Sequence, residues 1–80
     1  MPREPRTAEI LAEMVANVMK VAVAAGDRVD VGDAVVLLES MKMEIPVLSE
    51  HAGTVTAVRV APGDVVQEGD VLIAIEPGSV

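Results

Sequence analysis

The chain carries the stretch Gly26-Asp27-Arg28-Val29-Asp30-Val31-Gly32-Asp33, and 37 residues further on it carries Gly63-Asp64-Val65-Val66-Gln67-Glu68-Gly69-Asp70. Both stretches hold a Gly-Asp pair at each end and a valine at the same position between the pairs. Glycine accepts a positive φ angle and aspartate can hydrogen-bond a nearby backbone amide, so each pair predicts a tight turn. The two stretches therefore predict that the chain is built from two similar halves.

The similarity between the halves extends beyond these turns. The same shift pairs Val18, Val21, Val23 and Ala24 with Val55, Val58, Val60 and Ala61, Leu11 and Glu13 with Leu48 and Glu50, and Glu39 with Glu76. A solenoid needs at least three repeats. Two copies within 80 residues indicate instead two interlocking halves of one small domain.

The composition favours an aliphatic, β-rich core. The chain is 51% hydrophobic but lacks Phe, Tyr and Trp, so Val, Ala, Leu, Ile and Met supply that core. It has no cysteine, which excludes disulfides and a thiolate zinc site in this sequence. Its apolar stretches are too short for a bilayer span, and its first residues are polar where a signal peptide is apolar. We therefore expect a cytoplasmic location and no contact with a membrane.

The charge of the chain bears on its partners. The formal net charge of −7 would repel phosphate backbones, and the six basic residues form no patch that opposes this repulsion. We therefore expect no binding of nucleic acid. The acidity either keeps the domain soluble or draws it to basic surfaces on partner enzymes.

Apolar and polar residues alternate in short runs, which indicates half-buried strands. Met19, Val21 and Val23 are expected on one face of such a strand, with the intervening residues on the other face. Val18 and Val55 are out of phase with the residues that follow them. Because both halves show the same slip, we predict a bulge or corner at each position.

The region 8–19 admits two interpretations. Its apolar residues also have the spacing of a helix, but the repeat equates residues 9–13 with residues 46–50. Pro46 in the second copy suits an edge strand better than a helix interior, so we prefer strand for both copies.

These patterns together predict an all-β fold. We expect about eight strands arranged as a flattened barrel or sandwich, because matching corners in the two halves suit a curved sheet that closes on itself. Residues 9–77 are expected to form the domain, residues 1–8 a flexible N-terminal tail and residues 78–80 a C-terminal tail.

A tight hairpin is predicted at the middle of the chain. One apolar run, Val35–Leu38, leads in and another, Ile45–Leu48, leads out, so a two-residue loop would place Met41 and Lys42 at the tip. In that register Ser40 lies opposite Met43, and Glu39 lies opposite Glu44.

The hairpin breaks two local rules. Both tip residues would take positive φ angles, where Asn-Gly is favoured, at a cost on the order of 1 kcal/mol each. Glu39 and Glu44 would also face each other as like charges, which is unfavourable. Departures of this kind concentrate at functional sites, so Lys42 is the candidate site of the chain.

The run Glu39-Ser40-Met41-Lys42-Met43, centred between two Gly-Asp-bearing halves, resembles the biotinyl domains of the biotin carboxyl carrier family. The resemblance covers nearly all of residues 9–77. It implies a flattened eight-stranded β-barrel with quasi-twofold symmetry, with both termini at the pole far from the tip. It also implies that Lys42 is the residue to which biotin protein ligase attaches biotin, and that Met41 and Met43 are its usual flanks.

The resemblance has consequences for partners. It implies a domain that performs no chemistry itself and that carries carboxylate between a biotin carboxylase and a carboxyltransferase. We expect a monomeric domain and recognition by the ligase through Met41, Met43, Glu39 and Glu44. The chain departs from the family at Ser40, where alanine is usual, and at Ala16-Asn17, where Pro-Gly is usual.

Two other functions remain open. A lipoyl carrier has a similar barrel, but its lysine usually follows Asp and precedes Ala, which the methionine flanks do not match. An unmodified β-module for assembly is the third candidate.

Simpler roles exist for the other candidate residues. The two flanking methionines could fill the core, which is the usual role of methionine, and the two glutamates could form a solvated face. Turn chemistry explains the four Gly-Asp aspartates without a metal ion. His51 is expected to be a solvated loop residue.

Overall fold

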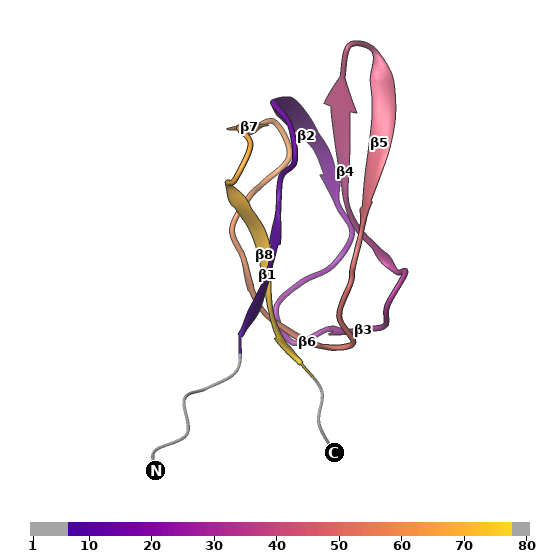
Figure 1. Cartoon of the computed structure of the whole chain (residues 1–80), viewed down its shortest axis with the longest axis vertical. Helices are drawn as coiled ribbons and strands as arrows, with labels where there is room; N and C mark the ends of the chain where they lie inside the picture. The colour runs from indigo at the N-terminus through magenta and orange to yellow at the C-terminus, as the bar shows by residue number, and fades with distance from the viewer. Residues whose placement is uncertain (1–6, 78–80) are drawn as a thin grey trace.

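Two four-stranded antiparallel sheets make up the computed structural model, which describes residues 7–77 (Figure 1). The strands are β1 (Ala8–Leu11), β2 (Ala16–Val21), β3 (Arg28–Val29), β4 (Ala34–Ser40), β5 (Met43–Leu48), β6 (Gly53–Val58), β7 (Val65–Val66) and β8 (Val71–Pro77). The strand order is β1-β8-β6-β3 in one sheet and β5-β4-β2-β7 in the other. The predicted all-β sandwich of eight strands is therefore confirmed.

The region that admitted a helix is extended. It forms β1 and the first part of β2, so the preference for strand is confirmed. The reason is tertiary: β1 pairs with β8, and β5, which is the counterpart of β1 in the other half, pairs with β4. Pro46 lies on β5 at the edge of its sheet, where its missing N–H breaks no ladder.

The two halves are related by the shift of 37 residues in their pairing as well as in their sequence. The register of β2 on β4 slips between Val18 and Lys20, and that of β6 on β8 slips between Val55 and Ala57. These are equivalent positions, so the predicted pair of bulges is confirmed. A bulge increases local twist, which helps each sheet curve over the other.

The prediction for Met19 is wrong. Val18 is 2% exposed and points into the core, whereas Met19 is 40% exposed. The bulge inserts one extra residue at this point, and the inward alternation resumes with Val21 and Val23, which pack against the core. The bulge was predicted at Val18, but its extra residue is Met19, which has no partner between Val18 and Lys20, so simple alternation placed Met19 on the wrong face.

The core lies between the two sheets and is aliphatic. Its most buried side chains include Leu72, Ile73 and Ile75 of β8 and Val35 of β4, all 0% exposed. Burying a side chain of this size stabilises the fold by roughly 1.5–3 kcal/mol. The core therefore holds the central strands β4 and β8 in place, and β4 leads to the candidate site.

The Gly-Asp pairs form turns as predicted. Their glycines have φ angles between 94° and 97°. In the first pair, the backbone N–H of Ala24 donates to Oδ2 of Asp27 at 2.8 Å, and the same bond recurs at Asp33, Asp64 and Asp70. The aspartates are therefore engaged in turn chemistry.

The ends of the described chain lie together, far from the β4–β5 hairpin (Figure 1). β1 begins at Ala8 and β8 ends at Pro77. Residues 1–6 and 78–80 lie outside the described residues, so the predicted tails remain predictions. The arrangement agrees with the expectation that the termini lie at the pole opposite the tip.

Candidate functional site

The β4–β5 hairpin projects as the far end of the molecule (Figure 1). Leu38 pairs with Ile45, Glu39 with Glu44, and Ser40 with Met43, which leaves Met41 and Lys42 as the two-residue loop. The predicted register is therefore confirmed at every tip position.

The turn is held in an unfavourable backbone conformation. Met41 has φ 53° and Lys42 has φ 65°, and they are the non-glycine residues with positive φ among those described. Each costs on the order of 1–2 kcal/mol for a residue with a Cβ atom. Burial of Val35, Val36 and Leu38 on β4 anchors the hairpin and offsets that cost.

The side chains at the tip are in solvent. Met41 is 90% exposed, Met43 is 62% exposed, and Lys42 is exposed between them. Core filling therefore does not explain the two methionines. The tip presents one primary amine between two apolar, flexible side chains.

The two glutamates flank the tip on opposite strands. Glu39 is half-buried and Glu44 is exposed, and their Cα positions are partners in the β4–β5 register. Like charges in such a pair repel each other weakly. The geometry places both carboxylates beside the turn, as the sequence predicted, and leaves their role as a prediction.

Gly53 has a packing role that the sequence did not reveal. A Cβ atom at this position would overlap the carbonyl oxygen of Glu76 and lie 2.8 Å from Cα of Pro77. Its counterpart in the first half is Ala16, which is buried but does carry a Cβ atom. The two halves therefore differ in how closely β6 and β2 approach their neighbours.

Among residues 7–77, the hydrogen bonds of His51 with a side chain run through its backbone. Its backbone N–H donates to Oγ of Ser49 at 3.2 Å, and the Ser49 hydroxyl donates to the His51 carbonyl at 2.6 Å. The residue lies in the loop between β5 and β6, as expected, and its side chain is partly buried there. Its contacts are those of a turn.

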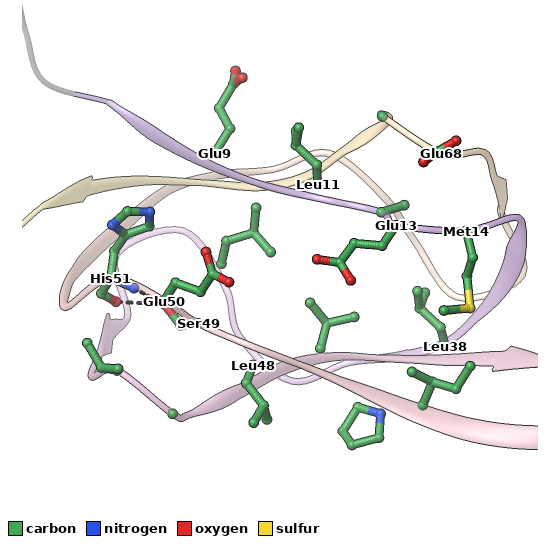
Figure 2. A pocket seen from close by; sticks show the side chains of 18 residues that line it. Glu9, Leu11, Glu13, Met14, Leu38, Leu48, Ser49, Glu50, His51 and Glu68 are labelled. Carbon is green, nitrogen blue, oxygen red and sulfur yellow. Dashed lines mark hydrogen bonds between the residues drawn. The ribbon is translucent and has the colours of Figure 1, made fainter.

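The sequence also gave no direct sign of a groove between β1 and β5 (Figure 2). Its volume is about 1030 Å³, and it does not include the tip residues 39–44.

Within residues 7–77, no cluster of three or more His, Asp or Glu could hold a metal ion, and no helix could cross a membrane.

The chain matches the family model described as "Biotin-requiring enzyme" over residues 3–75. Among curated proteins, it is 65% identical over 40 residues to biotinylated protein TB7.3 of Mycobacterium tuberculosis. It is 53% identical over 36 residues to the biotin/lipoyl attachment protein of Bacillus subtilis. These matches span 50% and 45% of this chain, and 56% and 49% of the relatives, so they cover about half the length of each.

Solved structures share the fold over more of the chain. A single-chain, multi-domain long-chain acyl-CoA carboxylase matches with a TM-score of 0.86 and 29% identity, over 100% of this chain and 8% of that one. The urea carboxylase of Kluyveromyces lactis matches with a TM-score of 0.83 and 29% identity, over 94% and 7%.

The lipoyl domain of the 2-oxoglutarate dehydrogenase complex of Azotobacter vinelandii matches with a TM-score of 0.70 and 25% identity, over 81% of this chain and 82% of that one. The family model covers almost the whole described domain and includes the lysine hairpin. The chain therefore belongs to the biotin-requiring family of biotinyl and lipoyl attachment domains.

Proposed function

We propose that this chain is a biotin carboxyl carrier whose Lys42 is acylated by biotin protein ligase. The observation that supports this most strongly is the exposed amine of Lys42 at the apex of a strained turn, between two exposed methionines. Biotin on this lysine would carry carboxylate from a biotin carboxylase to a carboxyltransferase. The domain itself is not the catalyst in this scheme.

The geometry suits a carrier. Lysine has a four-carbon stem with a terminal amine, and here nothing covers that amine within the described residues. The amine loses a proton and attacks the activated carboxyl group of biotin, which forms an amide and releases the activating group. A rigid, buried base beneath a long flexible arm then presents the attached group to each active site at high effective concentration.

The relatives support biotin over lipoate. The mycobacterial relative is named as biotinylated, and the two carboxylases share the fold with TM-scores above that of the lipoyl domain. The methionine flanks of Lys42 point the same way. Lipoylation remains the second candidate because the Bacillus relative is named for either group.

The chain offers a direct test because Lys20 and Lys42 are its two lysines. The protein is co-expressed with a biotin protein ligase in medium containing biotin, and its intact mass is measured. We expect one biotinyl adduct on the parent chain and on Lys20→Ala, and none on Lys42→Ala. An adduct that survives in Lys42→Ala would refute the assignment.

The same measurement separates the alternatives. A lipoyl-sized adduct on Lys42 after co-expression with a lipoate ligase, together with no biotinyl adduct, would favour the lipoyl carrier. The absence of both adducts from a folded chain would favour the unmodified assembly module.

We propose that the ligase recognises the flanking methionines. Replacing Met41 by Asp and Met43 by Ala should lower the rate of biotinylation while leaving the fold intact, because both side chains are in solvent. Met19→Ala is the control, since Met19 is also exposed but lies on β2. Unchanged labelling of the double variant would show that the ligase does not recognise the two methionines.

The proposal extends to location and assembly. We place the carrier in the cytoplasm as a monomeric domain that meets its ligase, carboxylase and carboxyltransferase there. Fractionation of the native host and sedimentation of the purified chain test these two points.

A further inference from the structure

The groove between β1 and β5 has an apolar interior and apolar lips (Figure 2). Ile10 and Leu38 contribute buried side chains to its lining. Leu11 and Leu48, which are equivalent positions in the two halves, are 43% and 50% exposed at its margins. Equivalent residues of the two halves therefore line the groove, and the groove exposes apolar surface.

With His51 counted as neutral, the charged residues that line the groove are all acidic. Within residues 7–77 its lining contains four glutamates, Glu9, Glu13, Glu50 and Glu68, and no lysine or arginine. Glu13 and Glu50 are again equivalent in the repeat, and their carboxylates extend into the groove from opposite sides (Figure 2). Two carboxylates that converge across an apolar channel favour a ligand with basic side chains.

The backbone along the groove is also open. In the described sheets β1 pairs with β8 and β5 pairs with β4, so the outer edge of each strand has no neighbour. Pro46 removes an N–H from the β5 edge, whereas its counterpart on β1, Glu9, keeps one. Strand addition is therefore favoured along β1 over β5.

We propose that the groove docks an extended, basic segment of a partner protein, which adds as a strand to β1. Alternating side chains of that segment would place apolar groups on the lining and basic groups near Glu13 and Glu50. The groove excludes the tip residues 39–44, so docking leaves Lys42 free to move between active sites. The inference goes beyond the carrier function and does not require that Lys42 be modified.

The test uses the full chain and a synthetic peptide of alternating arginine and valine, followed by amide chemical shifts in NMR. We expect saturable shifts along β1 and in the loops that hold Glu13 and Glu50, with binding that weakens as salt increases. A peptide with glutamate in place of each arginine should not bind. A peptide N-methylated at its valines should bind about tenfold more weakly, because it cannot complete the ladder with β1.

Matched variants locate the charges that matter. Glu13→Gln with Glu50→Gln should weaken binding about tenfold, since each exposed ion pair contributes only modestly to affinity. Glu44→Gln with Glu76→Gln removes the same charge from exposed positions outside the groove and should have a much smaller effect. Lys42→Ala should bind the peptide as well as the parent does, whether or not the parent can be biotinylated.

Several results would overturn the inference. These are equal binding of the acidic peptide, shifts centred on the tip, no loss in the Glu13 and Glu50 variant, or no binding at millimolar peptide. In the last case the glutamates would serve only to keep two sheet edges from pairing. Concentration-dependent shifts in the same residues without peptide would assign the groove to a second copy of the chain instead.

Discussion

The strand pairs β4–β5 and β8–β1 are built to the same pattern, and they differ at one end. Val36 pairs with Val47 in the first, and the equivalent Ile73 pairs with Ile10 in the second. Both pairs also slip by one residue at equivalent positions. The first pair closes in a strained hairpin that displays Lys42, while the second opens toward the two ends of the chain (Figure 1).

The two strand pairs differ in where residues with a side chain take positive φ angles. Glycines occupy the positive φ positions in the turns that both halves share, and among the described residues other side chains occupy such positions only at the hairpin tip. A two-residue Asn-Gly turn would close the same strands with less strain. The scaffold therefore has a sequence suited to stability, whereas the tip keeps residues that cost stability.

The largest effect is expected where the halves fail to match, at Gly53. Gly53→Ala should lower the free energy of unfolding by about 3 kcal/mol, because the new Cβ atom meets backbone of β8, which cannot move aside easily. Chemical denaturation followed by far-ultraviolet circular dichroism measures this change.

The counterpart variant is the control. Ala16→Gly in the first half should cost only about 1 kcal/mol, through chain entropy and lost packing. Equal losses for the two variants would show that β6 and β2 approach their neighbours in the same way.

A smaller loss is expected at the turns, where the halves do match. Gly63→Val should destabilise the domain by about 2 kcal/mol, because φ at this position is 96° and valine is β-branched. Gly26→Val, with φ 97°, should cost a similar amount. Apart from the two chain neighbours, no heavy atom of the described residues lies within 4 Å of a Cβ at either site, so the expected cause is backbone strain.

Thermal and urea denaturation of the two glycine variants provide the measurement. The fraction that stays folded should still be labelled on Lys42, since the tip lies in another part of the chain. A loss at Gly63 that far exceeds the loss at Gly26 would break the equivalence of the halves.

Much of this scaffold could be predicted because it depends on local and repeated signals. The Gly-Asp turns, the two bulges and the hairpin register each follow from residues close in sequence, and the repeat shows the turns and the bulges a second time. Met19 was misplaced because the position of the extra residue in a bulge depends on the partner strand.

The groove could not be predicted in the same way. Glu13 and Glu50 were recognised as equivalent residues, but they come to line one groove only after β1 and β5 occupy the edges of different sheets. The close approach at Gly53 has the same origin, since it depends on a carbonyl 23 residues away in the sequence. Both are properties of how strands assemble.

The tip itself should yield a gain in stability. Met41→Asn with Lys42→Gly replaces two side chains at positive φ by residues that accept it, and should raise the free energy of unfolding by about 1 kcal/mol. It should also abolish labelling because the amine is gone. Urea denaturation and intact mass measure the two effects, and unchanged or lower stability would show that the tip carries no strain.

The smallest effect is expected from the like charges beside the tip. Glu44→Lys places an opposite charge across from Glu39 and should stabilise the domain by a few tenths of a kcal/mol, because directly opposite charges attract on neighbouring strands. The gain should shrink as salt rises, since both groups lie close to solvent. At the other pole the repeat equates Glu39 with Glu76, whose strand partner is Thr54, so no like charge is paired with it there. Glu76→Lys should therefore leave stability almost unchanged, and urea denaturation at low and high salt measures both variants. If Glu76→Lys gave the larger gain, repulsion between Glu39 and Glu44 would not be a feature that sets the hairpin apart.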